Sequence, residues 1–260
     1  MAVALAAVLA ASPVPAALLF GLIFITGALE VTKLTKCSVA SVLSGLLLTG
    51  AAILVSATRG LSDLPAVLGI SWWLGAISLF VWKPKQFAFA GGLLLWLFAG
   101  AGAGMALQLQ SIGSNSAFLP NLLLMALVPL WVGDSMAYFV GKAWGRHKLA
   151  PAISPNKTVE GAVANLVGCV AAGWGLGFWL GVPVLASIAV GLSAGVFGQA
   201  GDLLQSRLKR TAGVKDSGSL LPGHGGVLDR MDSFLFSSYP SMMLLLWLAP
   251  ELFHVKQWPF

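Results

Sequence analysis

Acidic and basic side chains gather in one short polar stretch of this sequence, residues 206–232. Its acids are Asp216, Asp229 and Asp232, and five of the chain's 15 Lys and Arg residues accompany them. Carboxylates bind hard cations such as Mg²⁺, which often keep ligand positions for substrate phosphates. Lys neutralises phosphate as a point charge, and Arg does so through a bidentate fork. The stretch therefore has the residue types needed to hold a metal and a polyphosphate together.

Two further acids lie at costly positions, within or near the end of long apolar runs. Asp134 occurs in WVGDSMAYFVG, and Asp202 occurs in FGQAGDLLQSRLKR. A charge inside a membrane-spanning run is expensive unless it is paired or hydrated, so such an acid is a functional candidate. For any single acid, ion pairing with a nearby Lys or Arg is an equal alternative. With Asp229 and Asp232, these acids form a set that favours a metal site.

The polar stretch also contains a turn-forming segment, PGHGG, at residues 222–226. Such a backbone cannot sustain a helix, and it lets N–H groups approach a phosphate closely. His224 and Gly225 are therefore candidate substrate-binding residues. A turn histidine that is hydrogen-bonded only to its own loop is the alternative for His224.

A second polar segment, residues 141–161, precedes another apolar run. Ser154, which stands before a proline, or Thr158, with Glu160 behind it, would begin a helix there. The free N–H groups of a helix start attract anions, and Lys157 adds positive charge. An ordinary helix cap on a basic loop is the alternative.

The composition identifies the elements that must position these residues. Of the 260 residues, 58% are hydrophobic and 9% are charged, whereas soluble domains have roughly a quarter charged. Apolar runs of about 20 residues recur, and they lack the alternation of barrel strands. We expect an all-α polytopic membrane protein of about eight transmembrane helices, with seven to nine defensible. The expected spans are 3–29 (broken near Pro13 and Pro15), 39–57, 64–82, 87–109, 117–141, 160–180, 184–205 and 233–252.

These helices are expected to form a single membrane domain over residues 1–260. Residues 1–116 would supply hydrophobic helices, and residues 117–260 would carry the catalytic helices and the polar segments. Glycines at alternate positions, such as 100–104 and 173–177, predict close helix packing. A homodimer is compatible with these small-residue faces.

The distribution of basic residues predicts orientation. With eight spans, all Lys and Arg residues except Arg59 and Lys256 fall in connections on one side of the membrane. The positive-inside rule places that side in the cytoplasm and both termini outside. We therefore expect a multi-pass protein of the cytoplasmic (inner) membrane, with an active site near helix ends that faces the cytoplasm. The net charge of +6 needs no nucleic-acid partner to explain it.

The stretch 206–232 resembles the signature of the phosphatidate cytidylyltransferases, the CDP-diacylglycerol synthases. Residues upstream, within 133–161 and at Gly201-Asp202, extend the resemblance. One departure is Ala164-Asn165, where the family tends to have a glycine pair. The signature positions are Ser206, Lys209, Arg210, Lys215, Asp216, Gly218, Pro222, His224, Gly225, Gly226, Asp229, Arg230 and Asp232.

The resemblance implies transfer of a cytidylyl group from CTP to phosphatidic acid within a lipid bilayer, which yields CDP-diacylglycerol and pyrophosphate. It implies Mg²⁺ as cofactor and leaves a second metal or a monovalent cation open. Asp202 and Asp229 would be the principal metal ligands, with Asp232 and Asp134 as further ligands. The bases Lys209, Arg210, Lys215 and Arg230 would hold phosphates. Ser154, Lys157, Thr158 and Glu160 would complete the pocket, together with Ser206, His224 and Gly225.

Two other functions remain open at this point. Another CTP-dependent membrane lipid kinase or transferase would need the same metal, bases and lipid entrance. An anion transporter would explain acids within spans and basic loops, but it would not require the dense motif at 206–232.

Overall fold

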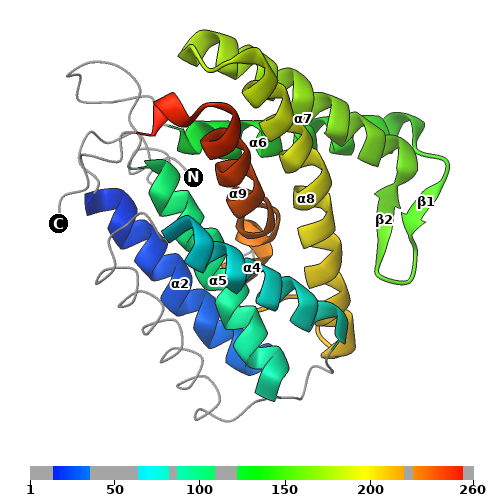
Figure 1. Cartoon of the computed structure of the whole chain (residues 1–260). Helices are drawn as coiled ribbons and strands as arrows, with labels where there is room; N and C mark the ends of the chain where they lie inside the picture. The colour runs from blue at the N-terminus through cyan, green and yellow to red at the C-terminus, as the bar shows by residue number, and fades with distance from the viewer. Residues whose placement is uncertain (1–13, 36–63, 82–86, 109–121, 220–224, 254–260) are drawn as a thin grey trace.

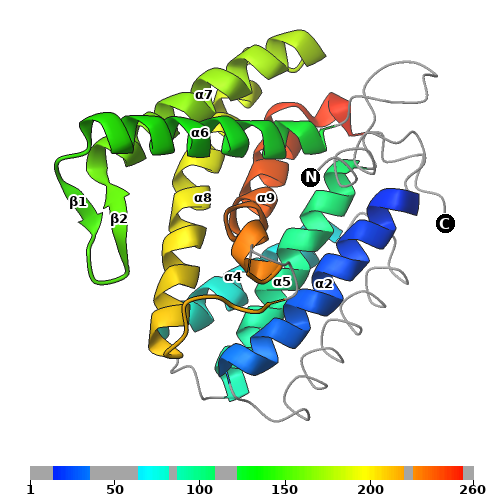
Figure 2. The same cartoon turned by 180° about the vertical axis from the view of Figure 1, so that it is seen from behind.

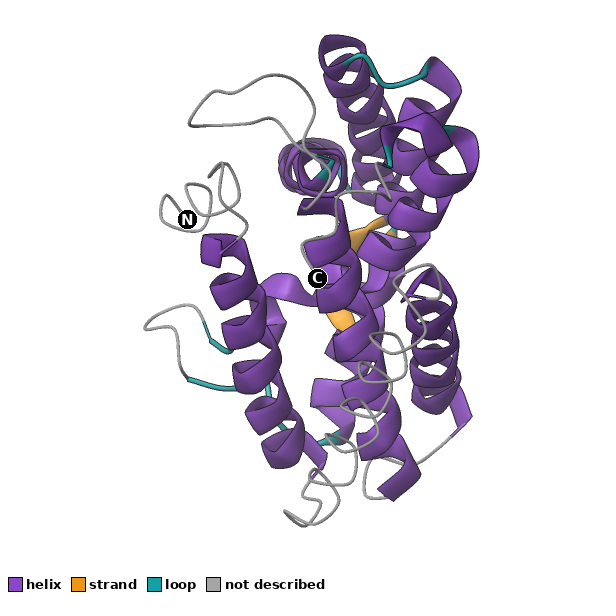
Figure 3. Ribbon diagram, turned by 60° about the vertical axis from the view of Figure 1, so that its left-hand side comes forward, coloured by secondary structure: helices purple, strands orange, loops and turns teal. Residues whose placement is uncertain are grey.

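A computed structural model of the chain describes residues 14–35, 64–81, 87–108, 122–219 and 225–253. Almost all of this part is helical, and one short pair of strands interrupts it (Figure 3). The elements are α2 (Val14–Thr35), α4 (Leu64–Val81), α5 (Phe87–Gln108), α6 (Leu123–Trp144), β1 (Lys148–Ala150), β2 (Ser154–Thr158), α7 (Val159–Leu180), α8 (Val184–Thr211), α9 (Leu228–Leu248) and the 3₁₀ turn η2 (Pro250–Leu252).

Helix α9 is the central element among the described helices, because it packs against α4, α5, α6 and α8. Helix α5 carries α2 and α4 on its other sides, and α6 and α7 lie against each other and against α8 (Figures 1 and 2). The buried core follows this arrangement. Its largest fully buried side chains include leucines of α5 and α9 such as Leu97 and Leu235.

The helical fold expected from the apolar runs is confirmed for the described residues. Four helices there are long and apolar enough to cross a membrane, and α4 and α5 contribute shorter apolar segments. The count of about eight spans stays a prediction, because the expected span 39–57 lies outside the described residues. Helix α2 begins at Val14, at the expected break. The four candidate spans are Leu18–Thr35, Leu123–Trp144, Val159–Leu180 and Val184–Thr211.

Several expected boundaries were wrong: α2 continues to Thr35 instead of ending at residue 29, and two further errors concern the polar stretch 206–232. Helix α8 continues to Thr211, and α9 begins at Leu228. The helix continues because Leu208 still turns its side chain into the core at 6% exposure, three residues after the equally buried Gln205. Much of the stretch therefore lies on two helices, and only the residues between them form the connection.

The expectation of a purely helical chain was also wrong in one place. Strands β1 and β2 form an antiparallel hairpin, with Lys148 opposite Thr158 and Ala150 opposite Ser154. The hairpin extends from the end of α6 and lies beside α8 (Figures 1 and 2). Strands of three and five residues are too short to produce a readable period-two pattern.

The expected close packing of small residues holds for some glycines and not for others. A Cβ atom at Gly173 would lie 2.8 Å from the carbonyl oxygen of Ser187 and 3.0 Å from the Cα of Gly191, both on α8. A Cβ atom at Gly175 would meet nothing within 4 Å. Both glycines lie on α7. Substitution of each by alanine therefore separates the effect of close packing from the effect of helix propensity.

We predict that Gly173→Ala lowers the stability of the protein in detergent, by about 1–3 kcal/mol, because α7 and α8 must move apart to admit the methyl group. Gly175→Ala is the matched control and should unfold at or slightly above the wild-type temperature, since alanine favours helix. Thermal unfolding followed by circular dichroism measures both. Equal melting temperatures for the two variants would show that α7 and α8 do not approach each other as described.

Candidate active site

The first polar contact of the site joins the hairpin to α8. Lys157 on β2 donates to the Oδ2 atom of Asp202, and both side chains are about two-thirds buried, at 28% and 34% exposure. Ser206, one turn further along α8, donates to the Oδ1 atom of Asp202 at 3.3 Å. Asp202 thus joins two other predicted site residues, one from its own helix and one from the distant hairpin.

The second contact joins the end of α8 to the start of α9. Lys209 Nζ lies 2.7 Å from Asp229 Oδ1, with side-chain exposures of 12% and 7%. The other oxygen, Oδ2, accepts from the backbone N–H groups of Ser217 and Gly226, each at 2.8 Å. Burial raises the pKa of the Asp229 carboxyl, but the bonds from Lys209 and from these two N–H groups outweigh it, so the pKa lies below its usual range.

Asp232 lies on the same helix, three residues after Asp229, and is electrostatically coupled to both ion pairs. Burial raises its pKa, and the negative charge of Asp202 raises it further. The bond from the Ser233 N–H and the charges of Lys209 and Lys157 act in the opposite direction and do not prevent the rise. Because these charges come from α8 and from the hairpin, Asp232 marks the place where the three elements meet.

Asp134 enters the site from α6 and is held by an amide. Asn165 on α7 donates to Asp134 Oδ1 at 3.1 Å, and Gln199 on α8 donates to the side-chain oxygen of Asn165 at 3.1 Å. Asp134 is close enough to Asp202 and Lys157 for their charges to interact. Asn165, where the sequence departs from the family pattern, therefore connects three helices around a predicted ligand.

The hairpin is held at its base by two contacts. Thr158 is the N-cap of α7, and its Oγ1 accepts from the Gly161 N–H at 3.1 Å. Glu160 accepts from His147 Nδ1 at 2.7 Å and from the His147 N–H at 3.3 Å. Of the two helix starts left open by the sequence, Thr158 is the one used, and Ser154 instead begins β2.

The remaining predicted bases have side chains that face outward. Arg210, Lys215 and Arg230 are all exposed, and Arg210 donates to the carbonyl oxygen of Val214 at 3.3 Å. His224 lies outside the described residues. Gly225 has a φ of 79°, a left-handed conformation that favours glycine. Its neighbour Gly226 donates its N–H to Asp229. At Gly226, the backbone N–H that was expected to approach a phosphate is thus bonded to a carboxylate of the protein itself.

Two residues of this cluster were missed in the sequence. Ser217 lies within the polar stretch and is buried, and its hydroxyl is 3.0 Å from Asp229 Oδ2. Glu30 on α2 is only 4% exposed and contacts the same serine. The cost of a charge at the end of an apolar run, the criterion that selected Asp134 and Asp202, would also have selected Glu30.

Comparison with known proteins decides the family. The sequence profile of the cytidylyltransferase family matches residues 1–249, nearly the whole chain. The chain belongs to the cytidylyltransferase family. The resemblance drawn from residues 206–232 is confirmed at this level.

Relatives within the family carry a more specific name. The phosphatidate cytidylyltransferase of Bacillus subtilis (strain 168) is 53% identical over 113 residues, which are 43% of this chain and 42% of that protein. The phosphatidate cytidylyltransferase of Staphylococcus aureus (strain COL) is 48% identical over 120 residues, 45% of each chain. The chain thus spans less than half the length of the curated relatives it matches.

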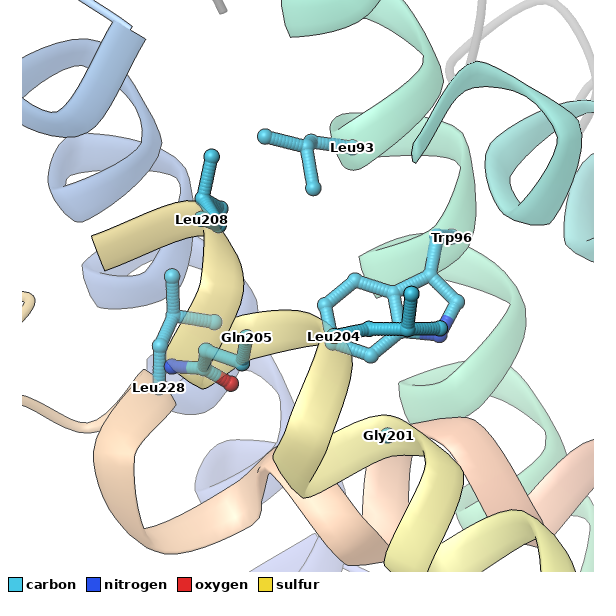
Figure 4. A pocket seen from close by; sticks show the side chains of 7 residues that line it. All are labelled: Leu93, Trp96, Gly201, Leu204, Gln205, Leu208 and Leu228. Atoms are coloured by element: carbon cyan, nitrogen blue, oxygen red, sulfur yellow. The ribbon is translucent and has the colours of Figure 1, made fainter. Parts of the chain in front are cut away.

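A small cavity lies one turn from Asp202, between α5, α8 and α9 (Figure 4). The side-chain amide of Gln205 and the indole nitrogen of Trp96 border it without a hydrogen-bond partner among the described residues. The other lining residues are Leu93, Gly201, Leu204, Leu208 and Leu228. Such an apolar lining does not suit a polyphosphate.

We predict that Thr158→Ala lowers stability by about 1 kcal/mol, because the first turn of α7 loses its side-chain cap. Thr158→Ser keeps a hydroxyl at the same position and should restore most of the loss. Thermal unfolding in detergent measures the difference. If the alanine variant melts at the wild-type temperature, the hydroxyl does not cap α7.

Proposed function

We propose that this chain transfers a cytidylyl group from CTP to phosphatidic acid and releases pyrophosphate. The observation that supports it best is the meeting of two Lys–Asp ion pairs, Lys157–Asp202 and Lys209–Asp229, around Asp232. Family membership and the names of the relatives point to the same reaction.

The reaction needs positioning and charge neutralisation more than a base. The phosphate of phosphatidic acid is already an oxyanion nucleophile. One of its oxygens forms a bond to the α-phosphorus of CTP, while the bond from that phosphorus to the oxygen bridging to the β-phosphate breaks. Pyrophosphate leaves with the bridging oxygen. Fixed positive charges that face the reacting phosphates stabilise such a transition state.

The bases of the site divide into two groups by their contacts. Lys157 and Lys209 are held by carboxylates, so they can offer a charge at a fixed place. Arg210, Lys215 and Arg230 are exposed on the surface, and Arg210 donates to the carbonyl oxygen of Val214 at 3.3 Å. We assign the fixed lysines to the transferring phosphate and the outer bases to the pyrophosphate end and the lipid phosphate.

The acids of the site fit a hard divalent cation. Asp202 and Asp232 supply oxygen donors from facing helices, and burial, together with the negative charge of Asp202, raises the pKa of Asp232. No group of three acidic, His or Cys side chains among the described residues has metal-binding spacing. Asp202 and Asp232 would therefore hold Mg²⁺ together with substrate phosphates and water, as is usual for this ion. When bound, Mg²⁺ would neutralise phosphate charge.

Asp229 and Asp134 would support this metal site in different ways. Both oxygens of Asp229 are engaged by Lys209 and by backbone N–H groups, so in this arrangement it holds the connection in place. Asp134 has one oxygen bonded to Asn165 and its other oxygen free of any such bond among the described contacts. Since no three acids among the described residues have metal-binding spacing, Asp134 would support the ion indirectly, through a metal-bound water, rather than as a third direct ligand.

We place the protein in the cytoplasmic membrane with this site on the cytoplasmic side. The alternation of basic connections supports that orientation, and CTP is available there. Exposed apolar side chains on α7, such as Trp174, Phe178 and Trp179, suit contact with lipid or with a second copy in a homodimer.

The activity is tested by incubating the purified chain in lipid vesicles with CTP, phosphatidic acid and Mg²⁺. CDP-diacylglycerol and pyrophosphate should appear in equal amounts, and removal of Mg²⁺ by a chelator should stop both. Consumption of CTP only with a different lipid acceptor would indicate another transferase. No CTP consumption with any acceptor would contradict the proposal and favour anion transport.

We predict that Asp202→Asn lowers turnover at least about 100-fold, because a neutral amide lacks the negative charge with which the carboxylate would bind Mg²⁺ and hold Lys157. Glu251→Gln is the charge-matched control, since Glu251 is exposed in η2 and away from the site, and it should leave turnover unchanged. Circular dichroism confirms that both variants are folded. Full activity of folded Asp202→Asn would remove Asp202 from the metal site.

A further inference from the structure

Glu30 is a buried carboxylate that reaches the polar stretch from the other end of the sequence. It accepts from the hydroxyl of Ser217 at 2.7 Å and from the backbone N–H groups of Val227 and Leu228 at 2.7 and 2.9 Å. Its helix, α2, packs against α5. Figure 2 shows the connection after α8 running toward α2 before α9 begins.

The contact with Val227 and Leu228 replaces a missing helix cap. Val227 is the N-cap residue of α9, and its own side chain makes no capping bond. The first N–H groups of a helix have no partner within it, and a negative charge there is favourable to the helix dipole. Glu30 supplies both the acceptors and the charge from a different helix.

The same segment holds Asp229. Ser217 and Gly226 give their N–H groups to Asp229, while the Ser217 hydroxyl and the next two N–H groups go to Glu30. The fit is close, because a Cβ atom at Gly218 would lie only 2.8 Å from Glu30 Oε1. The position of Glu30 therefore determines where the connection lies and where α9 presents Asp229 and Asp232.

We propose that Glu30 is a positioning residue for cytidylyl transfer, acting through α9 and the connection between α8 and α9. This inference rests on the proposed function for its effect on turnover. Glu30 touches no reacting atom in this arrangement. Its role is to fix the start of α9, so that Asp232 faces Asp202 and Lys209 faces Asp229.

The test compares Glu30→Gln with Glu251→Gln, which removes the same charge from an exposed site. A glutamine turns an N–H₂ group toward groups that are themselves donors, so at least one hydrogen bond is lost. We expect turnover to fall about tenfold, with the KM for CTP within about twofold of wild type. Amide hydrogen exchange at Val227 and Leu228 should accelerate about tenfold, and exchange in α7 should stay unchanged.

Ser217→Ala is a second variant that keeps both carboxylates and removes only the hydroxyl between them. It should accelerate amide hydrogen exchange at Val227 and Leu228 by a smaller factor. If Glu30→Gln does not fold, the same measurement on Ser217→Ala tests the proposal. A purely structural role for Glu30 would raise exchange throughout the protein and leave turnover per folded molecule unchanged. That result, or unchanged exchange at Val227 and Leu228, would overturn the proposal.

The two proposals fail in different ways. If the folded wild-type protein produces no CDP-diacylglycerol, cytidylyl transfer is contradicted. Amide hydrogen exchange at Val227 and Leu228 in the Glu30→Gln variant would still decide whether Glu30 positions α9. An active wild type with an unaffected Glu30→Gln variant would contradict only the role of Glu30.

Discussion

The buried ion pair between Lys209 and Asp229 is the interaction on which the rest of the site depends. A charge taken out of water is tolerated only when opposite charge and hydrogen bonds surround it, and removing one partner of such a pair is strongly destabilising. Here the pair ties the last turns of α8 to the first turn of α9. Among the described helices, α9 also packs against α4, α5, α6 and α8. This one ion pair therefore fixes the charged site relative to the buried core.

Much of this arrangement could be predicted from sequence because its causes are local. Apolar runs predicted the helices, since the length and hydropathy of a span are properties of consecutive residues. The cost of a charge in such a run selected Asp134 and Asp202, and each is hydrogen-bonded to another element, Asp134 to Asn165 on α7 and Asp202 to Lys157 on β2. Thr158 was one of two expected helix starts because capping depends on a few adjacent residues.

The remainder could not be predicted because it depends on contacts between distant segments. No local pattern connects Glu30 with Val227, or Asn165 with Asp134, and the partner of each is fixed only when the helices pack. The hairpin was missed for a different reason, since its strands are too short to show a period. The boundaries of α8 and α9 were misjudged because charged side chains near Lys209 concealed a helical face that continues to Leu208.

Ser217 gives the connection between α8 and α9 an unusual property. Its hydroxyl oxygen lies 2.7 Å from a Glu30 oxygen and 3.0 Å from an Asp229 oxygen, yet a hydroxyl carries a single hydrogen. The two bonds are alternatives, and rotation about the Cβ–Oγ bond exchanges them without any movement of the backbone. Glu30 on α2 and Asp229 on α9 thus compete for one proton, so this serine hydroxyl can bond to a helix from either half of the chain, one bond at a time.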